Sequence, residues 1–120
     1  MAKILIIEDD TDLAEVLRFT LSNKGHSVQA LSGSKDALPM LRVYKYDLII
    51  LDWMMPGLNG CEVVKRLRQN SDTAKIPIVM LTAKDGVESR EQMASLNLAG
   101  YLVKPFSPLE LIQKVREVLA

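Results

Sequence analysis

The sequence predicts an α/β fold, in which helices cover both faces of a parallel β-sheet. Short apolar runs of the strand type alternate along the chain with segments whose apolar residues recur at helical spacing. The connections between these segments are short, as they are in repeated strand–helix units. The run at 48–51 contains only Leu and Ile, which is typical of a strand buried on both faces. A length of 120 residues gives room for one core, so we expect a single domain over residues 1–120.

The first strand is expected at residues 4–7, and a helix follows it. Thr11 is expected to cap that helix, and Gly25 follows its end, where glycine is common. The spacing of apolar residues predicts one buried helix face, made by Leu13, Val16, Leu17, Thr20 and Leu21.

The second strand is expected at residues 27–31, at an edge of the sheet, because Ser27 and Gln29 indicate one exposed side. Ser34 is the expected cap of the next helix, and Pro39 falls inside that helix. Since proline removes a backbone hydrogen bond, we expect it to distort or shorten the helix. The apolar positions of this helix are Ala37, Leu38 and Leu41.

The third strand is expected at residues 48–51 and the fourth at 76–81. Gly60 is expected to open the helix between them, with an inward face of Cys61, Val64 and Leu67.

A further helix is predicted over residues 85–96, because Asp85 and Glu88 have the spacing of a capping box. The last strand is expected at 101–103. The final helix has a strong start, with a capping serine, a proline at the first position and an acid three residues after the cap: Ser107, Pro108 and Glu110.

Composition excludes several classes of protein. The chain has 15 basic and 15 acidic side chains, so it has no overall positive field to attract nucleic acid or an anionic membrane surface. Cys61 is the single cysteine, which rules out an internal disulfide and fits a reducing compartment. No secretory signal pattern is present, and no apolar run approaches the ~20 residues that span a bilayer. We therefore expect a cytoplasmic protein that binds neither nucleic acid nor membrane directly.

Polar side chains follow four of the expected strands at the point where each strand ends. In chain order they are Glu8 and Asp9, then Asp52, Thr82 and Lys104. Ligands of open parallel sheets bind beyond the carboxyl ends of the strands, so neighbouring strands would bring these side chains into one pocket. Asp10 is interpreted only as an acid that favours the start of a helix.

This set of side chains indicates phosphoryl chemistry. Carboxylates packed together repel one another unless a cation compensates. Oxygen ligands select a hard ion, and an incomplete cage that keeps water suits Mg²⁺ better than Ca²⁺. A metal, a lysine and a hydroxyl suit a phosphoryl group, and an aspartate can act as its nucleophile and hold it as an acyl phosphate.

Four segments of the chain together are similar to one known family. They are residues 4–9, Asp52 with the Met-Met-Pro-Gly sequence at 54–57, the Leu-Thr-Ala step at 81–83, and Lys-Pro-Phe at 104–106. In this order and spacing the chain resembles, over its whole length, the CheY-like receiver domains of bacterial two-component response regulators. The resemblance implies a doubly wound, flavodoxin-like (βα)5 parallel sheet with strand order 2-1-3-4-5.

The resemblance implies roles for the acids. Asp52 resembles the phosphoacceptor, which takes a phosphoryl group from a histidine on a sensor histidine kinase or a histidine phosphotransfer protein. Asp9 resembles a direct ligand of Mg²⁺, for which Mn²⁺ can substitute. Glu8 is similar to an acid acting mainly through water, and the backbone carbonyl of Met54 to a further ligand. Asp52 is also counted among the metal ligands.

The resemblance also implies a switch. Thr82 is similar to the switch hydroxyl, Lys104 to the phosphate-binding lysine and Tyr101 to the aromatic that turns inward on phosphorylation. The Lys104–Pro105 bond resembles the cis peptide of the family, a form almost confined to such steps. The downstream partner would be an output protein, or an effector domain in a longer chain. Only phosphotransfer to itself and its own dephosphorylation are then expected, so the protein is not predicted to be an enzyme.

Three alternatives stay open at this stage. A magnesium-dependent phosphatase working through an aspartyl phosphate usually needs an acid two residues after the nucleophile, where this chain has Met54. A flavodoxin-like cofactor binder needs a phosphate loop after the first strand, where Glu8, Asp9 and Asp10 would repel phosphate. A receiver-like docking module that is never phosphorylated does not explain why the acidic pocket is complete.

Overall fold

The computed structural model describes residues 1–33, 35, 37–54, 60–83 and 94–120. In this part of the chain, parallel strands form one five-stranded sheet in the order β2-β1-β3-β4-β5, which confirms the order implied by the resemblance. The strands are β1 (Lys3–Ile7), β2 (Ser27–Leu31), β3 (Leu48–Asp52), β4 (Ile78–Ala83) and β5 (Gly100–Lys104).

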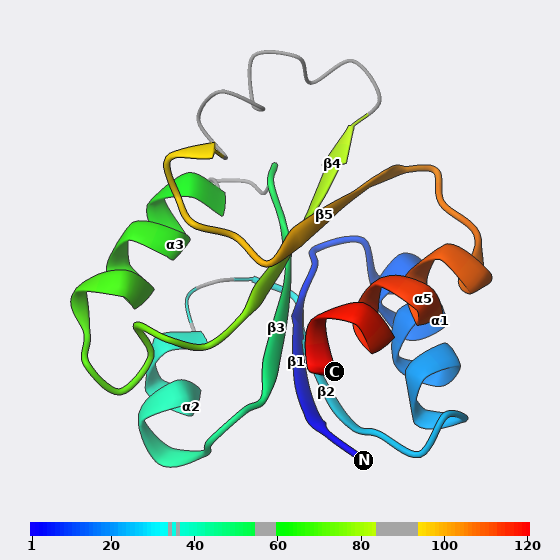
Figure 1. Ribbon diagram of the computed structural model, residues 1–120, viewed down its shortest axis with the longest axis horizontal. Coiled ribbons are helices and arrows are strands. Elements are labelled where there is room, and N and C mark those ends of the chain that lie inside the picture. The colour runs from blue at the N-terminus through cyan, green and yellow to red at the C-terminus, as the bar shows by residue number, and fades with distance from the viewer. Residues whose placement is uncertain (34, 36, 55–59, 84–93) are drawn as a thin grey trace.

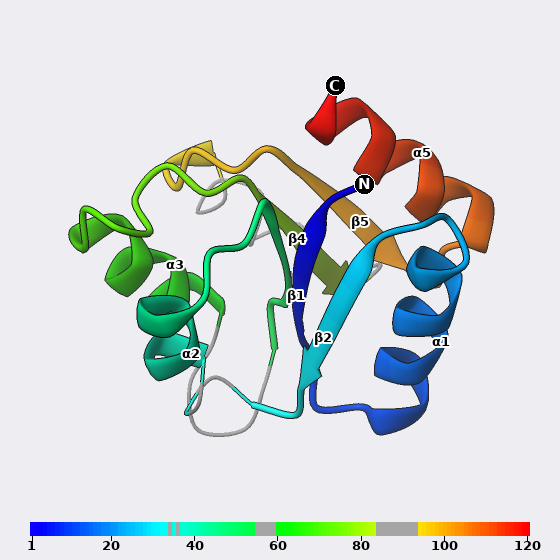
Figure 2. The same ribbon diagram turned by 90° about the horizontal axis from the view of Figure 1, so that it is seen from below.

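Helices cover both faces of the sheet, as expected. In Figure 1 the sheet is seen nearly edge-on, with α2 and α3 on one side and α1 and α5 on the other. Figure 2 shows the same two layers from below. The helices are α1 (Thr11–Ser22), α2 (Ala37–Val43), α3 (Gly60–Gln69) and α5 (Pro108–Leu119). Of the described helices, none is long and apolar enough to cross a membrane.

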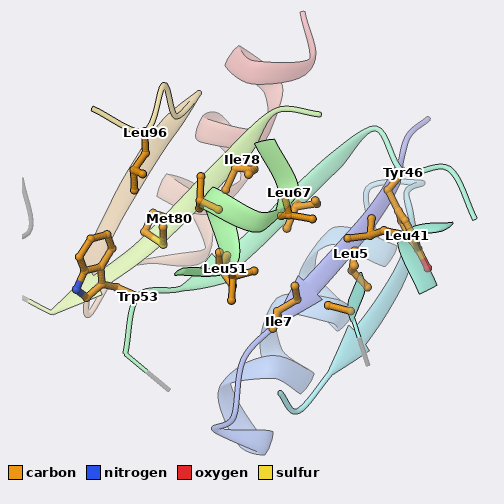
Figure 3. Close-up of a cluster of buried hydrophobic side chains, with 14 residues drawn as sticks. Leu5, Ile7, Leu41, Tyr46, Leu51, Trp53, Leu67, Ile78, Met80 and Leu96 are labelled. Carbon is orange, nitrogen blue, oxygen red and sulfur yellow. The ribbon is translucent and has the colours of Figure 1, made fainter. Parts of the chain in front are cut away.

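Alternate residues of the inner strands fill two separate cores. The cluster under α2 and α3 takes Leu5, Ile49 and Met80, and Figure 3 shows its side chains meeting between the sheet and these helices. The cluster under α1 and α5 takes Ile6 and Ile50. Each of these five strand residues is fully buried. The continuous apolar runs of the sequence are therefore explained by burial on both faces.

The start of α1 differs from the prediction. Asp10, not Thr11, is the cap, and its side chain accepts hydrogen bonds from the backbone N–H groups of Asp12 and Leu13. Asp10 does this better because its carboxylate is also favoured by the positive end of the helix dipole. Val16, predicted to be inward, is 54% exposed. The buried positions of α1 are Ala14, Leu17 and Leu21, and Val16 points about 100° away from Leu17.

The other elements agree with the prediction to within about two residues. β4 begins at Ile78 rather than at residue 76. The capping box of α5 is confirmed, with Ser107 as cap, Pro108 in the first turn and Glu110 at the third position. Helix α2 is short and contains Pro39, as expected of a helix with an internal proline. The cap at Ser34 and nearly all of the helix predicted over 85–96 lie outside the described residues.

The two ends of the chain lie together, away from the carboxyl ends of the strands. Met1 and Ala120 line the same groove, and so do Asp47 and Pro77, which precede β3 and β4. In Figure 1 both termini are seen at the lower end of the sheet.

Candidate functional site

Neighbouring strands bring the predicted polar residues to one edge of the sheet. Asp52 ends β3, Thr82 is next to last in β4, Lys104 ends β5, and Glu8 follows β1. The register places Asp52 beside Leu81 and Thr82 beside Val103, so these strands end nearly level. The convergence that the sequence predicted is therefore a consequence of the strand order.

Lys104 lies between two of the carboxylates. Its Nζ donates to Oε1 of Glu8 at 2.8 Å and lies 3.2 Å from Oδ1 of Asp52. Glu8 is fully buried, and Asp52 and Thr82 are 5% and 4% exposed. Glu8, Asp52 and Thr82 are therefore held out of bulk water, whereas Lys104 is partly exposed.

Three carboxylates form a group able to hold a metal ion. One oxygen each from Glu8, Asp9 and Asp52 lies within 4.8 Å of the others. Asp9 is exposed, whereas the other two are buried, so the group opens toward solvent on the Asp9 side. A donor set of oxygens alone fits a hard divalent ion such as Mg²⁺, and the open side leaves room for the water that this ion usually keeps.

The charged groups of the pocket shift one another's pKa. Burial, together with the hydrogen bond to Asp52, raises the pKa of Glu8 to about 7, although the hydrogen bond from Lys104 opposes the rise. Burial alone would lower the pKa of Lys104, but its contacts with Glu8 and Asp52 outweigh this and raise that pKa. Lys104 therefore stays charged. The three carboxylates still repel one another, and a bound cation would reduce this repulsion.

Backbone hydrogen bonds fix the acids. The Glu8 N–H donates to the Leu31 carbonyl at 3.0 Å, and its Oε2 accepts from the Asp10 N–H at 3.1 Å. On the other side of the pocket, the Met54 N–H donates to Oδ1 of Asp52 at 3.4 Å. Both buried carboxylates are thus oriented by local backbone as well as by Lys104.

The remaining residues implied by the resemblance lie around this pocket. The Lys104–Pro105 peptide bond is cis. Tyr101, on β5, is 43% exposed, so its ring stands toward the surface in this structure. The side chain of Met54 is 67% exposed, directly beyond the strand that carries Asp52. Trp53 is only 7% exposed and packs in the core cluster under α2 and α3.

Gly60 is the site residue whose importance the sequence did not indicate. It was predicted only as the first residue of a helix, yet its N–H donates to the Trp53 carbonyl at 2.7 Å, and a Cβ atom here would lie 3.0 Å from the Asp52 carbonyl oxygen. The only signal in the sequence is the glycine itself, at the first position of the expected helix.

Among the hollows in the described part of the chain, one lies beside Lys104 and another lies at the opposite end of the sheet. A pocket of about 430 Å³ beside Lys104 is lined by Asp10, Leu13, Ala83, Pro105 and Phe106. A larger groove of about 720 Å³ lies at the opposite end of the sheet, against both chain ends. Size alone would favour this groove, but it lies at the opposite end of the sheet from the three carboxylates and Lys104.

A family model and several relatives match this chain. The model described as "Response regulator receiver domain" matches residues 4–116. The chain is 38% identical over 119 residues to the phosphate regulon transcriptional regulatory protein PhoB of Rhizobium meliloti, covering 99% of this chain and 52% of that protein. It is 40% identical over 119 residues to the alkaline phosphatase synthesis transcriptional regulatory protein PhoP of Bacillus subtilis, covering 98% and 48%. The chain thus spans about half the length of these curated relatives.

Solved structures agree in fold. The chemotaxis response regulator CheY4 of Vibrio cholerae superposes with a TM-score of 0.92 at 33% identity, covering 99% of both chains. A response regulator from Chloroflexus aurantiacus gives the same TM-score and identity, covering 98% of this chain and 97% of that one. Both similarities extend over nearly the whole chain and therefore include the sheet.

Proposed function

This chain belongs to the family of response regulator receiver domains, and from that premise we propose that phosphorylation of Asp52 makes it a switch in a two-component relay. A receiver domain of two-component response regulators is a signalling domain, and the acidic pocket formed by Glu8, Asp9 and Asp52 fits Mg²⁺ and a phosphoacceptor aspartate. The observation that supports the proposal most is Lys104, whose ammonium lies 3.2 Å from the Asp52 carboxylate at the mouth of that acid group.

The proposed reaction is transfer of a phosphoryl group to Asp52. A carboxylate oxygen of Asp52 attacks phosphorus in a phosphohistidine of the partner. An O–P bond forms while the P–N bond breaks, and the electron pair of that bond leaves with the imidazole, which takes up a proton. Lys104 orients and neutralises the phosphoryl oxygens, and Thr82 donates its hydroxyl to one of them.

Mg²⁺ is the proposed cofactor, and Mn²⁺ can take its place. Asp9 and Asp52 would bind it directly, Glu8 mainly through water, and the Met54 carbonyl would be a further ligand. When bound, the ion offsets the negative charge of the acids and of the phosphoryl oxygens. The ion would then replace Lys104 as the main positive charge near Glu8, which would leave Lys104 free to contact the phosphoryl group.

The proposed output is a change in the surface around β5. Movement of Thr82 toward the phosphoryl group vacates space beside β5, and the exposed ring of Tyr101 turns into it. A phosphoryl group can shift such an equilibrium only through contacts that differ between the two states, which Thr82 and Lys104 provide.

Response regulators pair with histidine kinases and with output effectors, and we propose both kinds of partner for this chain. The donor is a sensor histidine kinase or a histidine phosphotransfer protein. The output is a separate protein or an effector domain in a longer chain, since the relatives PhoB and PhoP are about twice the length matched here. We propose that residues 1–120 act as one receiver unit, in the cytoplasm, where Cys61 stays reduced.

The test is phosphorylation by acetyl phosphate in the presence of Mg²⁺. We expect the intact mass to rise by one phosphoryl group, and the rise to disappear with EDTA or in Asp52→Asn. Asp72→Asn, which removes an exposed aspartate outside the pocket, is the matched control and should be labelled like the wild type. An unlabelled wild type, beside a receiver that is labelled under the same conditions, would contradict the proposal. Release of many phosphates per protein molecule from a small ester would instead identify a phosphatase.

A further inference from the structure

Helix α3 begins unusually close to the end of the strand that carries Asp52. A Cβ atom placed on Gly60 would lie 3.0 Å from the Asp52 carbonyl oxygen, 3.0 Å from Trp53 Cα and 3.0 Å from Met80 Sδ. Contacts of this length are tighter than nine in ten real Cβ contacts, so the neighbouring atoms would have to move by a few tenths of an ångström. Two of the three atoms belong to backbone, which has no rotamer through which it could move away.

A hydrogen bond holds the same two segments together. The Gly60 N–H donates to the Trp53 carbonyl at 2.7 Å, and on the opposite side the Trp53 N–H donates to the Leu81 carbonyl at 2.8 Å. The residue after Asp52 is therefore fixed to β4 by its N–H and to α3 by its carbonyl. Its short distance to α3 is available only because residue 60 has no side chain.

Fixing Trp53 also fixes its two neighbours in the chain. The Asp52 carboxylate extends from the residue before it and accepts from the Met54 N–H at 3.4 Å, on the residue after it. If α3 were pushed outward, the direction of the carboxylate and that of the Met54 peptide would change together. Such changes should lower the affinity of a metal site made of a few oxygen ligands, because this affinity depends on the groups that orient the ligands.

We propose that Gly60 is a positioning residue for the phosphorylation site: its missing side chain lets α3 fix the backbone from Asp52 to Met54 in the orientation that metal binding and phosphorylation require. The proposal rests on the function proposed above. Gly60 acts through its neighbours and does not itself contact the reacting atoms.

The experiment compares Gly60→Ala with Gly33→Ala, a matched control because a Cβ atom on Gly33 meets nothing within 4 Å. Mg²⁺ affinity, followed by Trp53 fluorescence, should fall about tenfold in Gly60→Ala and stay unchanged in Gly33→Ala. The rate of phosphorylation by acetyl phosphate should fall with it. Wild-type affinity and rate in a folded Gly60→Ala protein would overturn the proposal.

A second variant separates positioning from simple loss of packing. Gly60→Ala combined with Met80→Ala removes the contact with sulfur but keeps both backbone contacts. We expect Gly60→Ala to lower the Mg²⁺ affinity by the same factor in the Met80→Ala protein as in the wild type. Full recovery of affinity in the double variant would show that only the Met80 side chain was disturbed, which would overturn the proposal.

A measurement on the wild type does not depend on any variant folding. Because the Gly60 N–H is bonded to Trp53, its amide resonance should shift and its hydrogen exchange should slow when Mg²⁺ binds, whereas the Gly33 amide should not respond to the same degree. If the protein binds Mg²⁺ but the resonance and hydrogen exchange of the Gly60 amide do not change, the positioning role is contradicted. A wild type that neither binds Mg²⁺ nor takes a phosphoryl group would contradict the proposed function itself.

Discussion

Glu8 is the most deeply buried of the described acidic and basic side chains. It is fully buried, and its raised pKa of about 7 means that the folded protein holds this proton to higher pH than the unfolded chain does. Because the carboxyl pKa is raised in the folded state, ionisation of Glu8 lowers stability, and this loss appears as pH rises from the ordinary pKa of 4.5 through about 7. Lys104 reduces the loss without removing it.

A neutral side chain at position 8 should therefore stabilise the metal-free protein. In EDTA at about pH 8, Glu8→Gln is expected to raise the free energy of unfolding by about 1–2 kcal/mol, measured by urea denaturation. The gain should disappear at about pH 4, where Glu8 is protonated in both states. Glu15→Gln, at an exposed acid whose pKa is lowered by the hydrogen bond from Arg18, should show no such gain at high pH. A less stable Glu8→Gln at high pH would mean that the ion pair with Lys104 outweighs burial.

His26 gives a second dependence on pH, far from the acids. Its Nδ1 accepts a hydrogen bond from the Ala2 N–H at 3.1 Å, which only the neutral ring can do. Burial and the charge of the N-terminus lower the pKa of His26, so its contribution to stability is present above the ordinary histidine pKa of 6.5 and is lost as pH falls below it. Between about pH 7.5 and pH 5.5, wild type should lose more unfolding free energy than His26→Gln. Equal losses in the two proteins would exclude this role.

At the scale of elements, one arginine links three segments. Arg68, near the end of α3, donates from one terminal nitrogen to the carbonyls of Ala74 and Ile76, both at 2.9 Å, and from the other to Asn97 at 3.3 Å. Asn97 has a left-handed backbone, with φ of 56°, just before β5. The side chain therefore ties the end of α3 to the approaches of both β4 and β5.

Removing this link should lower the stability of the fold without changing phosphorylation of Asp52. Arg68→Ala leaves three carbonyls to find new partners, so we expect a loss of about 1–3 kcal/mol in urea denaturation. Arg66→Ala, which removes an exposed arginine from the same helix, should cost much less. Equal effects of the two substitutions would mean that the contribution of Arg68 is only charge and helix propensity.

Most elements and the main site residues could be predicted, because their signals are local. The run at 48–51 and the Ser107 capping box specify their structures within a few residues, and strand ends identify Asp52 and Lys104 once the strands are neighbours. Val16 was assigned to the wrong face because helical spacing alone does not show how wide a stripe the sheet covers. The contacts of Gly60 could not be predicted, since they join segments whose distance is set by packing.

At the scale of the whole molecule, the sheet separates two cores that share the same strands. Glu8 and Asp9 directly follow β1 and Asp52 ends β3, and these two strands are adjacent in the sheet. An ion bound by all three joins these strands only in the folded state, so its binding free energy adds to the stability of the entire domain.

Mg²⁺ should therefore stabilise the protein against urea. At an ion concentration of about 100 times the dissociation constant, the free energy of unfolding should rise by about 2.7 kcal/mol, and EDTA should remove the gain. Asp9→Asn should abolish most of this dependence, whereas Asp12→Asn, at an exposed acid on α1, should keep it. A stability that is the same with Mg²⁺ and EDTA would show that the acid group does not hold the ion.

The positions of Met1 and Ala120, together at the far end of the sheet from the acids, bear on how the protein can be handled. A biotin, a fluorophore or a flexible tether attached at either terminus would leave the aspartates facing open solution. On a sensor chip, a molecule immobilised in this way would leave its acidic edge accessible to phosphodonors and metal chelators in the flowing solution. A dye at either terminus would detect a partner bound at the acidic edge only by distance-dependent energy transfer.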